Sequence, residues 1–209
     1  MPIDMDKIYR TVPIDRIPWN IATPPQALVD LVESGKIKPC KSIDLGCGAG
    51  NYVVWLAEKG FDVTGLDIAP TAIRIAEENA RKKGLNCRFI VADVLGDLRE
   101  IKETFDFAYD WEVLHHIFPD ERDKYVRNVH RLLNPGGKYL SVCFNEGDSG
   151  FGGNGKFRKT QLGTVLYFSS LEELKSLFEP YFHITEAGVM TIQGKGVEHL
   201  VNYFFMEKK

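Results

Sequence analysis

Three glycines at alternate positions constrain this chain more than any other feature of its sequence. Gly46, Gly48 and Gly50 stand in the stretch IDLGCGAGN, which follows a short apolar run and precedes a helical pattern. Glycine adopts positive φ readily and has no Cβ, so it permits tight turns and a close approach to the backbone. A plain tight turn needs one such residue, whereas three in alternation between a strand and a helix are typical of a ligand loop. We therefore predict that this loop meets a nucleotide-like ligand.

Strand and helix patterns alternate along most of the chain. Parallel strands need a crossover connection, usually a helix, so this alternation predicts an α/β fold with a doubly wound, mostly parallel sheet. The predicted strands are 41–45, 62–67, 87–93, 105–110 and 138–144, and the predicted helices are 24–35, 51–60, 69–84 and 120–133.

The C-terminal part departs from this alternation. Ser170 and Glu173 have the spacing of a capping box, which predicts a helix over 169–178. Two strand patterns, 182–190 and 197–207, follow without a helix between them, so we expect an antiparallel pair at the edge of the sheet. The Gly-rich stretch 145–163 is longer than an ordinary surface loop, and we interpret it either as a disordered insertion or as a lid.

Size and charge narrow the class of protein. With 209 residues and 44% hydrophobic residues, the chain is expected to form one domain, 1–209. The net charge of -3 gives no basic excess for a nucleic-acid partner. The sequence has neither an apolar run that would span a membrane nor a signal-peptide core, so we expect a cytoplasmic protein, monomeric or homodimeric. The four cysteines contain no CxxC pair, so we expect reduced thiols and no metal site.

Aspartates lie at the ends of the first three predicted strands. Asp44 precedes the glycines, Asp67 ends the second strand and Asp93 ends the third. Ligands of such sheets bind at the carboxyl ends of the strands, where Asp67 is placed for ribose hydroxyls and Asp93 for an adenine amine. The carboxylate of Asp44 favours a ligand with a positive amino group over a pyrophosphate. Asn51 stands where a dinucleotide loop has its third glycine, which disfavours an NAD-linked oxidoreductase.

These motifs together resemble the class I S-adenosylmethionine-dependent methyltransferases, which are Rossmann-like. DLGCGAG matches their first motif, GLDIA their ribose acid and VADV their adenine segment, and LLNPGGKYL is similar to a later turn and strand. The resemblance covers roughly residues 25–144 and implies a seven-stranded sheet with an antiparallel last strand. It implies S-adenosyl-L-methionine as cofactor and S-adenosyl-L-homocysteine as product. The residues that we expect around the cofactor are Trp19, Asp44, Gly46, Cys47, Gly48, Gly50, Asp67, Ile68, Asp93, Val94, Asp110 and Trp111.

A narrower resemblance concerns two segments. IPWNIATPPQALVDLVESGKI and YDWEVLHHIFPDERDKYVRNVHRLLNPGG are similar to regions of the thiol and halide methyltransferases. In that group the tryptophan region closes over the cofactor, which implies a cap over residues 1–24 with Trp19 on the pocket. The alternative is a core tryptophan that anchors the first helix. The resemblance favours a thiol, selenol, tellurite or halide as methyl acceptor. Alternatives are an O, N or C acceptor, such as a quinone or a phenol, or a cofactor-binding module without turnover.

Methyl transfer from a sulfonium is a direct displacement, so we expect no catalytic triad and no covalent intermediate. A thiol acceptor would benefit from a general base, whereas a halide needs none. His115 and His116 follow the fourth predicted strand and are our candidates for that base. The alternative is that both rings pack against the next helix or meet solvent. Cys47 is either a small side chain beside the cofactor or a thiolate stabilised at a helix start.

Overall fold

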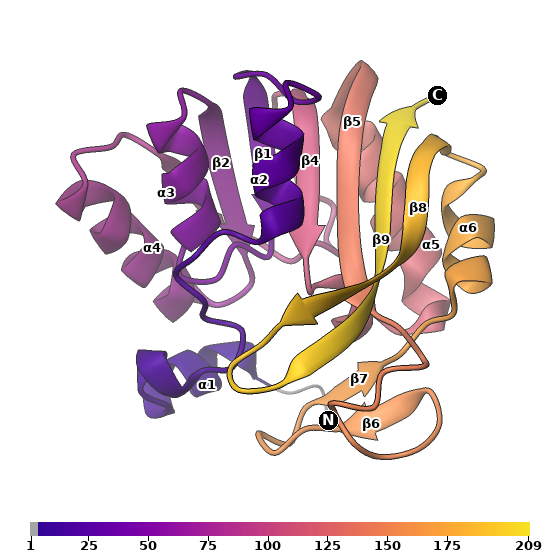
Figure 1. The fold of residues 1–209 in the computed structure, drawn as a ribbon. Helices are drawn as coiled ribbons and strands as arrows, with labels where there is room; N and C mark the ends of the chain where they lie inside the picture. Colours follow the sequence, from indigo (N-terminus) through magenta and orange to yellow (C-terminus); the bar gives the residue numbers. More distant parts are fainter. Residues whose placement is uncertain (1–3) are drawn as a thin grey trace.

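A computed structural model describes residues 4–209 (Figure 1). The first three residues of the predicted cap, 1–24, lie outside this range. A seven-stranded sheet forms the centre of the molecule. Its strands, in spatial order, are β3 (Arg88–Val91), β2 (Asp62–Asp67), β1 (Lys41–Leu45), β4 (Phe105–Trp111), β5 (Leu133–Phe144), β9 (Glu198–Lys208) and β8 (Phe182–Gln193).

The pairing of these strands confirms the expected fold. Strands β1 to β5 run parallel to one another, and β9 pairs antiparallel with both β5 and β8. The two C-terminal strands do pair, but only β8 lies at the edge. The inner position of β9 explains its apolar sequence, because Val201, Phe204 and Phe205 are buried between the helical layers on both faces.

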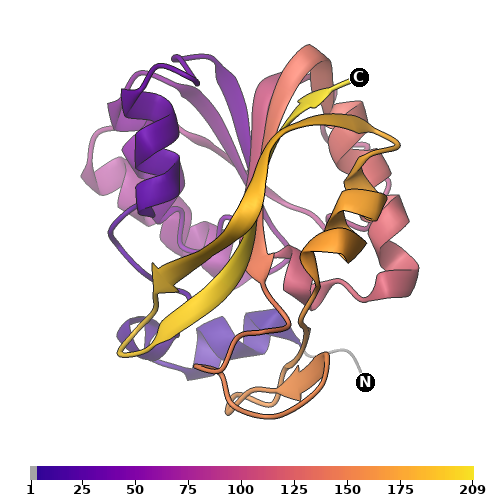
Figure 2. The same cartoon turned by 45° about the vertical axis from the view of Figure 1, so that its right-hand side comes forward.

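Helices cover both faces of the sheet (Figures 1 and 2). One apolar cluster packs α2 and α3 against the sheet, and another packs α5 and α6 against its opposite face. Side chains of β5 alternate between the two clusters, as the period of a strand requires: Leu140 and Val142 belong to one, and Tyr139 and Cys143 to the other. The helix bounds are α2 (Gln26–Glu33), α3 (Asn51–Glu58), α4 (Pro70–Lys82), α5 (Pro119–Leu132) and α6 (Leu171–Phe178), the last with the expected capping box.

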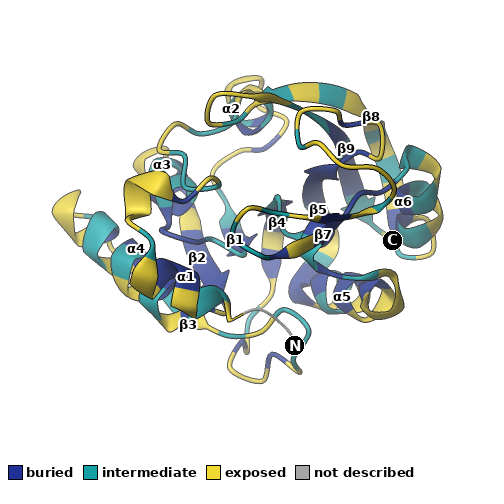
Figure 3. Ribbon diagram, turned by 90° about the horizontal axis from the view of Figure 1, so that it is seen from below, coloured by how far each residue is buried: buried dark blue, intermediate teal, exposed yellow. Residues whose placement is uncertain are grey.

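Three short elements that the sequence patterns did not predict lie at the carboxyl edge of the parallel strands. They are α1 (Met5–Thr11) and the strands β6 (Phe157–Lys159) and β7 (Val165–Tyr167), which pair antiparallel. Figure 3 looks onto this edge, where α1 contacts α4 and β7 contacts the 3-10 turn η2 (Leu114–His116). The Gly-rich stretch 145–163 therefore leads into a small hairpin that packs beside the sheet. Its role as a lid stays a prediction.

Candidate active site

A cavity of about 470 Å³ opens at the carboxyl ends of β1, β2 and β4. We call it the first cavity. Its walls come from the N-terminal segment, the glycine loop, the residues after β2 and β3, and the segment after β4. The predicted site residues that line it are Trp19, Asp44, Gly46, Cys47, Gly48, Asp67, Ile68, Asp93, Val94, Trp111 and His116.

All three glycines of the loop have positive φ, at +84°, +52° and +72°. A Cβ on Gly46 would lie 2.3 Å from Val113 Cγ2, and one on Gly48 would lie 2.8 Å from the Tyr9 hydroxyl. A Cβ on Gly50 would lie 2.7 Å from the Ala76 Cβ, and Gly50 is not part of the cavity wall. The space beside all three glycines is therefore filled by side chains of the protein itself. Gly50 allows α3 to pack closely on α4.

Asp67 fixes the glycine loop against the end of β2. Its Oδ2 accepts a hydrogen bond from the Gly48 N–H at 2.9 Å, and its Oδ1 accepts one from the Ala69 N–H at 2.8 Å. Burial raises the pKa of this carboxyl, and the backbone hydrogen bonds oppose the rise. Each oxygen keeps a lone pair for a ligand in the cavity. Ile68, the next residue, is half exposed beside it.

Asp44 also lines the first cavity and is more deeply buried than Asp67. Its Oδ2 accepts a hydrogen bond of 2.9 Å from the Tyr109 hydroxyl. Burial raises the pKa of Asp44 to about 8. Burial also raises the pKa of the adjacent Cys47 thiol well above its usual value. Cys47 is thus poorly suited to be a nucleophile, and the interpretation as a small side chain beside the ligand is the better one.

The segment after β3 is held by its own backbone and by α5. Asp93 Oδ1 accepts a hydrogen bond from the Leu95 N–H at 2.8 Å. Asn128 of α5 donates to the carbonyl oxygens of Val94 at 2.8 Å and Gly96 at 2.9 Å. Asp93 and Val94 therefore stand at a fixed place on the cavity wall.

Asp110 and Trp111 lie on opposite sides of β4, as neighbours in a strand do. Trp111 lines the first cavity, but Asp110 does not. Asp110 is fully buried and accepts hydrogen bonds from the hydroxyls of Tyr125 and Tyr139. Burial raises its pKa to about 6. The structure thus places Asp110 in the core between β4 and α5.

The N-terminal segment lines one side of the first cavity and is joined to the glycine loop and α3 by polar contacts. The Trp19 indole N–H donates to the Tyr9 hydroxyl at 2.8 Å, and that hydroxyl lies against Gly48. Asn51, at the start of α3, donates to the Asn20 side-chain oxygen at 2.9 Å. The sequence analysis did not identify Tyr9. It identified Asn51 only as a departure from the dinucleotide loop and not as a residue that holds the N-terminal segment.

A second cavity of about 360 Å³ adjoins the first. Five segments far apart in the sequence form its walls: residues 16–21, the segment after β4, the end of β5, residues 150–166, and the tip of the β8–β9 hairpin. Phe144, Phe151 and Leu166 give it apolar surface, and His115 and His199 add polar atoms. The residues common to both cavities are Trp19, Ile21, Glu112 and His116.

The two predicted histidines differ in their surroundings. His115 is buried, stacks on Phe144 with ring centroids 4.4 Å apart, and lines only the second cavity. The His116 ring lies edge-on to Trp19 at 6.4 Å and lines both cavities. Burial lowers the pKa of His116 to about 4 and that of His115 well below its usual value. Both imidazoles are therefore neutral at pH 7.

Glu112 was missed by the sequence analysis. It follows β4 directly, has a φ of +67° and lines both cavities. Its backbone N–H donates to the Val142 carbonyl at 2.8 Å. Burial raises the pKa of its carboxyl to about 7. The only sequence signal was its place between two expected site residues, Trp111 and His115.

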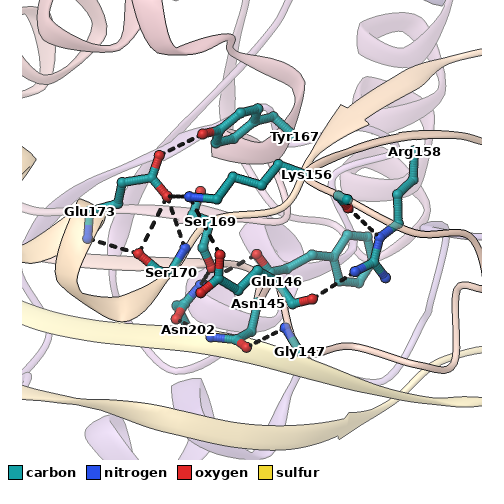
Figure 4. A network of polar contacts seen from close by, with 12 residues as sticks. Asn145, Glu146, Gly147, Lys156, Arg158, Tyr167, Ser169, Ser170, Glu173 and Asn202 are labelled. Carbon is teal, nitrogen blue, oxygen red and sulfur yellow. Dashed lines mark hydrogen bonds and ion pairs between the residues drawn. The ribbon is translucent and has the colours of Figure 1, made fainter.

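Arg158 holds the segment after β5 in place (Figure 4). Its guanidinium donates to the carbonyls of Glu146, at 2.7 Å, Asp148 and Gly155, and lies 4.1 Å from the Phe168 ring centroid. Arg158 is 7% exposed. It therefore fixes the backbone on both sides of Gly150 and Phe151, which line the second cavity.

Within residues 4–209, no group of His, Cys, Asp or Glu side chains has the arrangement of a metal site. All four cysteines are free thiols. None of the helices in this range is long and apolar enough to cross a membrane.

Residues 43–137 match the family model described as a methyltransferase domain. The chain is 33% identical over 132 residues to a 2-heptyl-1-hydroxyquinolin-4(1H)-one methyltransferase of Mycobacteroides abscessus, an alignment that covers 63% of this chain and 57% of that protein. It is 30% identical over 132 residues to the probable thiol methyltransferase 2 of Arabidopsis thaliana, which covers 61% of this chain and 56% of that protein. The chain thus spans little more than half the length of these curated relatives. It carries a class I S-adenosylmethionine-dependent methyltransferase domain.

A solved structure has a similar fold over nearly the whole length of this chain. It comes from work on the conversion of a disulfide bond into a thioacetal group during echinomycin biosynthesis. The match has a TM-score of 0.80 and 26% sequence identity, and it covers 98% of this chain and 90% of that one. This match confirms the fold that the motifs predict. The family model and the curated relatives confirm the methyltransferase class and its cofactor.

Proposed function

We propose that this chain transfers the methyl group of S-adenosylmethionine to a small organic acceptor by direct in-line displacement. The observation that carries the proposal is the pair of adjoining cavities with a common wall of four residues. A displacement needs the donor sulfur, the methyl carbon and the acceptor atom on one line, with water excluded. Two cavities that meet at one wall supply separate places for donor and acceptor.

The residues of the first cavity fit the proposed cofactor. The carboxyls at the ends of β1 to β3 are spaced along its wall, and each keeps an oxygen lone pair beyond its hydrogen bonds within the protein. We propose that Asp67 binds the ribose hydroxyls and that Asp93, with Ile68 and Val94, holds the adenine. Asp44 would face the amino end, with Gly46, Cys47, Gly48 and Trp111 around the methionine part and Trp19 as cap. When bound, the cofactor supplies an electrophilic methyl group on a sulfonium.

We propose the second cavity as the acceptor site. Its volume of about 360 Å³ lies within the range of sites for small organic ligands and far exceeds that of a halide ion. Its aromatic and aliphatic surface suits the body of an organic thiol or selenol. A hydroxyl compound is the alternative, since one relative is named for a thiol and another for a hydroxyquinolinone. His115 and His116 form walls of this site.

The proposal is tested first by binding and then by turnover. S-adenosylmethionine and S-adenosylhomocysteine should raise the melting temperature, because ligand at about a hundredfold over its Kd adds roughly 2.7 kcal/mol. NADH should not. Labelled methyl groups should then appear on members of a panel of aliphatic thiols and phenols. A rise with NADH alone, or cofactor binding without transfer to any acceptor, would contradict the proposed activity.

A matched pair of variants locates the cofactor. Asp67→Asn should weaken S-adenosylhomocysteine binding by about 10- to 100-fold, because it replaces a charged acceptor of two backbone hydrogen bonds with a neutral amide. Asp62→Asn changes an exposed aspartate at the other end of the same strand and should leave the affinity as it is. Equal affinities for the two variants would place the cofactor elsewhere.

A further inference from the structure

We infer that Glu112 accepts the proton of a protic methyl acceptor, a thiol or a hydroxyl compound, held in the second cavity. The inference rests on the proposed methyl transfer and names its general base. It also names the substrate class, because an anionic acceptor such as a halide has no proton to remove.

The position of Glu112 on the common wall is the first argument. The transferred group must cross from the first cavity to the second at this wall, so a base that serves the reaction has to stand on it. Of the four residues of the wall, Trp19 and Ile21 have no basic atom. Glu112 and His116 are therefore the two candidates.

The backbone of Glu112 is the second argument. Its φ of +67° is a left-handed conformation that non-glycine residues rarely adopt. Such conformations cost about 1 kcal/mol or more, and they persist where the surrounding structure enforces them, often at functional sites. Here the hydrogen bond from the Glu112 N–H to the Val142 carbonyl fixes the turn at the end of β4. The turn keeps residue 112 on the wall of both cavities.

The electrostatic surroundings are the third argument. No residue among 4–209 forms a hydrogen bond or an ion pair with the Glu112 carboxylate, so its proton affinity remains available to a ligand. Burial raises its pKa to about 7, whereas burial lowers the pKa of His116 to about 4 and makes that imidazole a weak base. The other titratable or charged groups around the two cavities are Tyr9, Asp44, Cys47, Tyr52, Asp67, Asp93, Glu121, Arg16, His115, Lys159, Lys195 and His199.

The proposed step balances as follows. The acceptor X–H bond breaks, its proton passes to a Glu112 carboxylate oxygen, and the electron pair left on X forms the new bond to the methyl carbon. The bond from that carbon to the sulfonium sulfur breaks, and its electron pair stays on sulfur as a neutral thioether. Glu112 then releases the proton to water. Net, one acceptor and one sulfonium give a methylated acceptor, a thioether and a proton.

The decisive experiment compares a protic with an aprotic acceptor. 2-Mercaptoethanol and iodide are offered to the wild type, to Glu112→Gln, to His116→Asn and to the exposed-site control Glu100→Gln. We expect Glu112→Gln to lower kcat with the thiol by about 100-fold, the usual size of a general-base contribution. Transfer to iodide and the affinity for S-adenosylhomocysteine should stay within about threefold. The Glu100→Gln control should behave as the wild type with both acceptors.

The pH profile separates the two candidate bases. With the thiol, kcat of the wild type should rise to a plateau above pH 7, since Glu112 acts when ionised. His116→Asn should keep that inflection, and Glu112→Gln should lose it. The assignment is overturned if Glu112→Gln retains thiol turnover, loses thiol and iodide transfer equally, or if His116→Asn removes the inflection.

A titration of the Glu112 carboxyl tests the inference without measuring activity, so it does not depend on a catalytically competent variant. In carboxyl-labelled protein, the ¹³C spectrum of the wild type minus that of Glu112→Gln gives the titration of this carboxyl alone. A midpoint near 7 supports the inference, and ionisation complete by about pH 5 overturns it, because such a carboxylate is a poor proton acceptor. Cofactor binding without transfer to either probe would instead contradict the proposed function, and with it the assignment of Glu112 as the general base.

Discussion

The two cavities share a wall but differ in how the rest of each is built. The first cavity is made by residues that end consecutive parallel strands, so Asp44, Asp67 and Asp93 come together by the repetition of one local pattern. The second cavity is made by segments as distant as Arg16, Phe144 and Lys195. Even the Lys195 ammonium, at the tip of the β8–β9 hairpin, reaches back to the carbonyls of Asp15 and Ile17.

This difference suggests that the two cavities can be disturbed separately. A residue whose contacts lie in the glycine loop should affect the cofactor, and a residue that holds the insertion should affect the acceptor alone. Trp19, on the common wall, should affect both. The following variants test that separation, from the largest expected effect to the smallest.

Gly46→Ala should nearly abolish cofactor binding. The new Cβ would lie 2.3 Å from Val113 Cγ2, so the loop has to move, and we expect S-adenosylhomocysteine affinity to fall by at least about 100-fold, or roughly 2.7 kcal/mol. Gly35→Ala is the control, because Gly35 also has a positive φ, of +75°, but has open space around its Cβ. It should cost about 1 kcal/mol of unfolding free energy and no affinity. If both variants bind S-adenosylhomocysteine with similar affinity, crowding at Val113 is not the reason that residue 46 is a glycine, and the positive φ alone is.

Arg158→Gln should damage the acceptor site and spare the cofactor site. The variant removes the charged donor of the hydrogen bonds to the carbonyls of Glu146, Asp148 and Gly155, and each such bond contributes about 1.5–3 kcal/mol. We expect kcat/KM for a thiol to fall by about 10- to 100-fold, with S-adenosylhomocysteine affinity within about twofold by calorimetry. Arg99→Gln, at an exposed arginine, is the control. An equal loss of cofactor affinity would show that the two cavities are coupled.

Trp19→Phe should weaken both sites slightly. It keeps a ring on the common wall but removes the indole N–H that donates to the Tyr9 hydroxyl. The loss of one hydrogen bond, about 1 kcal/mol, corresponds to a change of about fivefold in cofactor Kd and acceptor KM. Trp55→Phe changes a half-buried tryptophan of α3 that lines neither cavity, and it should change neither constant. An effect of Trp19→Phe on the cofactor alone would remove this residue from the acceptor site.

We expect cofactor binding to release a proton from the Asp44 carboxyl, and Asp44→Asn should abolish that release. The carboxyl has a pKa of about 8 in the free protein, so it is mostly protonated at pH 7. A ligand ammonium beside it would favour the ionised form, and up to about one proton should leave. Calorimetry in two buffers of different ionisation enthalpy measures this number. A release that persists in the variant would assign the proton to another group.

The same carboxyl gives the pH dependence of stability a definite sign. Its pKa is higher in the folded than in the unfolded state, so its contribution is complete below about pH 4 and is lost as pH rises through about 8. Relative to Asp44→Asn, the wild type should therefore lose unfolding free energy between pH 5 and 8, by up to about 1.4 kcal/mol per pH unit. Denaturant titrations at several pH values measure the difference, and a constant difference would contradict it.

The sequence by itself determined the strand order along the chain, the glycine loop and the carboxylates at the strand ends. These depend on local patterns: a period of two or 3.6 residues, a capping box, and glycines where φ is positive. Most of the residues that it named for the cofactor do line the first cavity, because residues that end parallel strands must meet at one edge of the sheet. The tertiary structure alone decided that Gly50 packs against Ala76 and that Asp110 lies in the core. It also decided that Arg158 is buried and that Glu112 stands beside His116 on the common wall. A side chain's burial, and with it the pKa of Glu112 or His116, is set by atoms from segments far apart in the sequence, and no local pattern contains them.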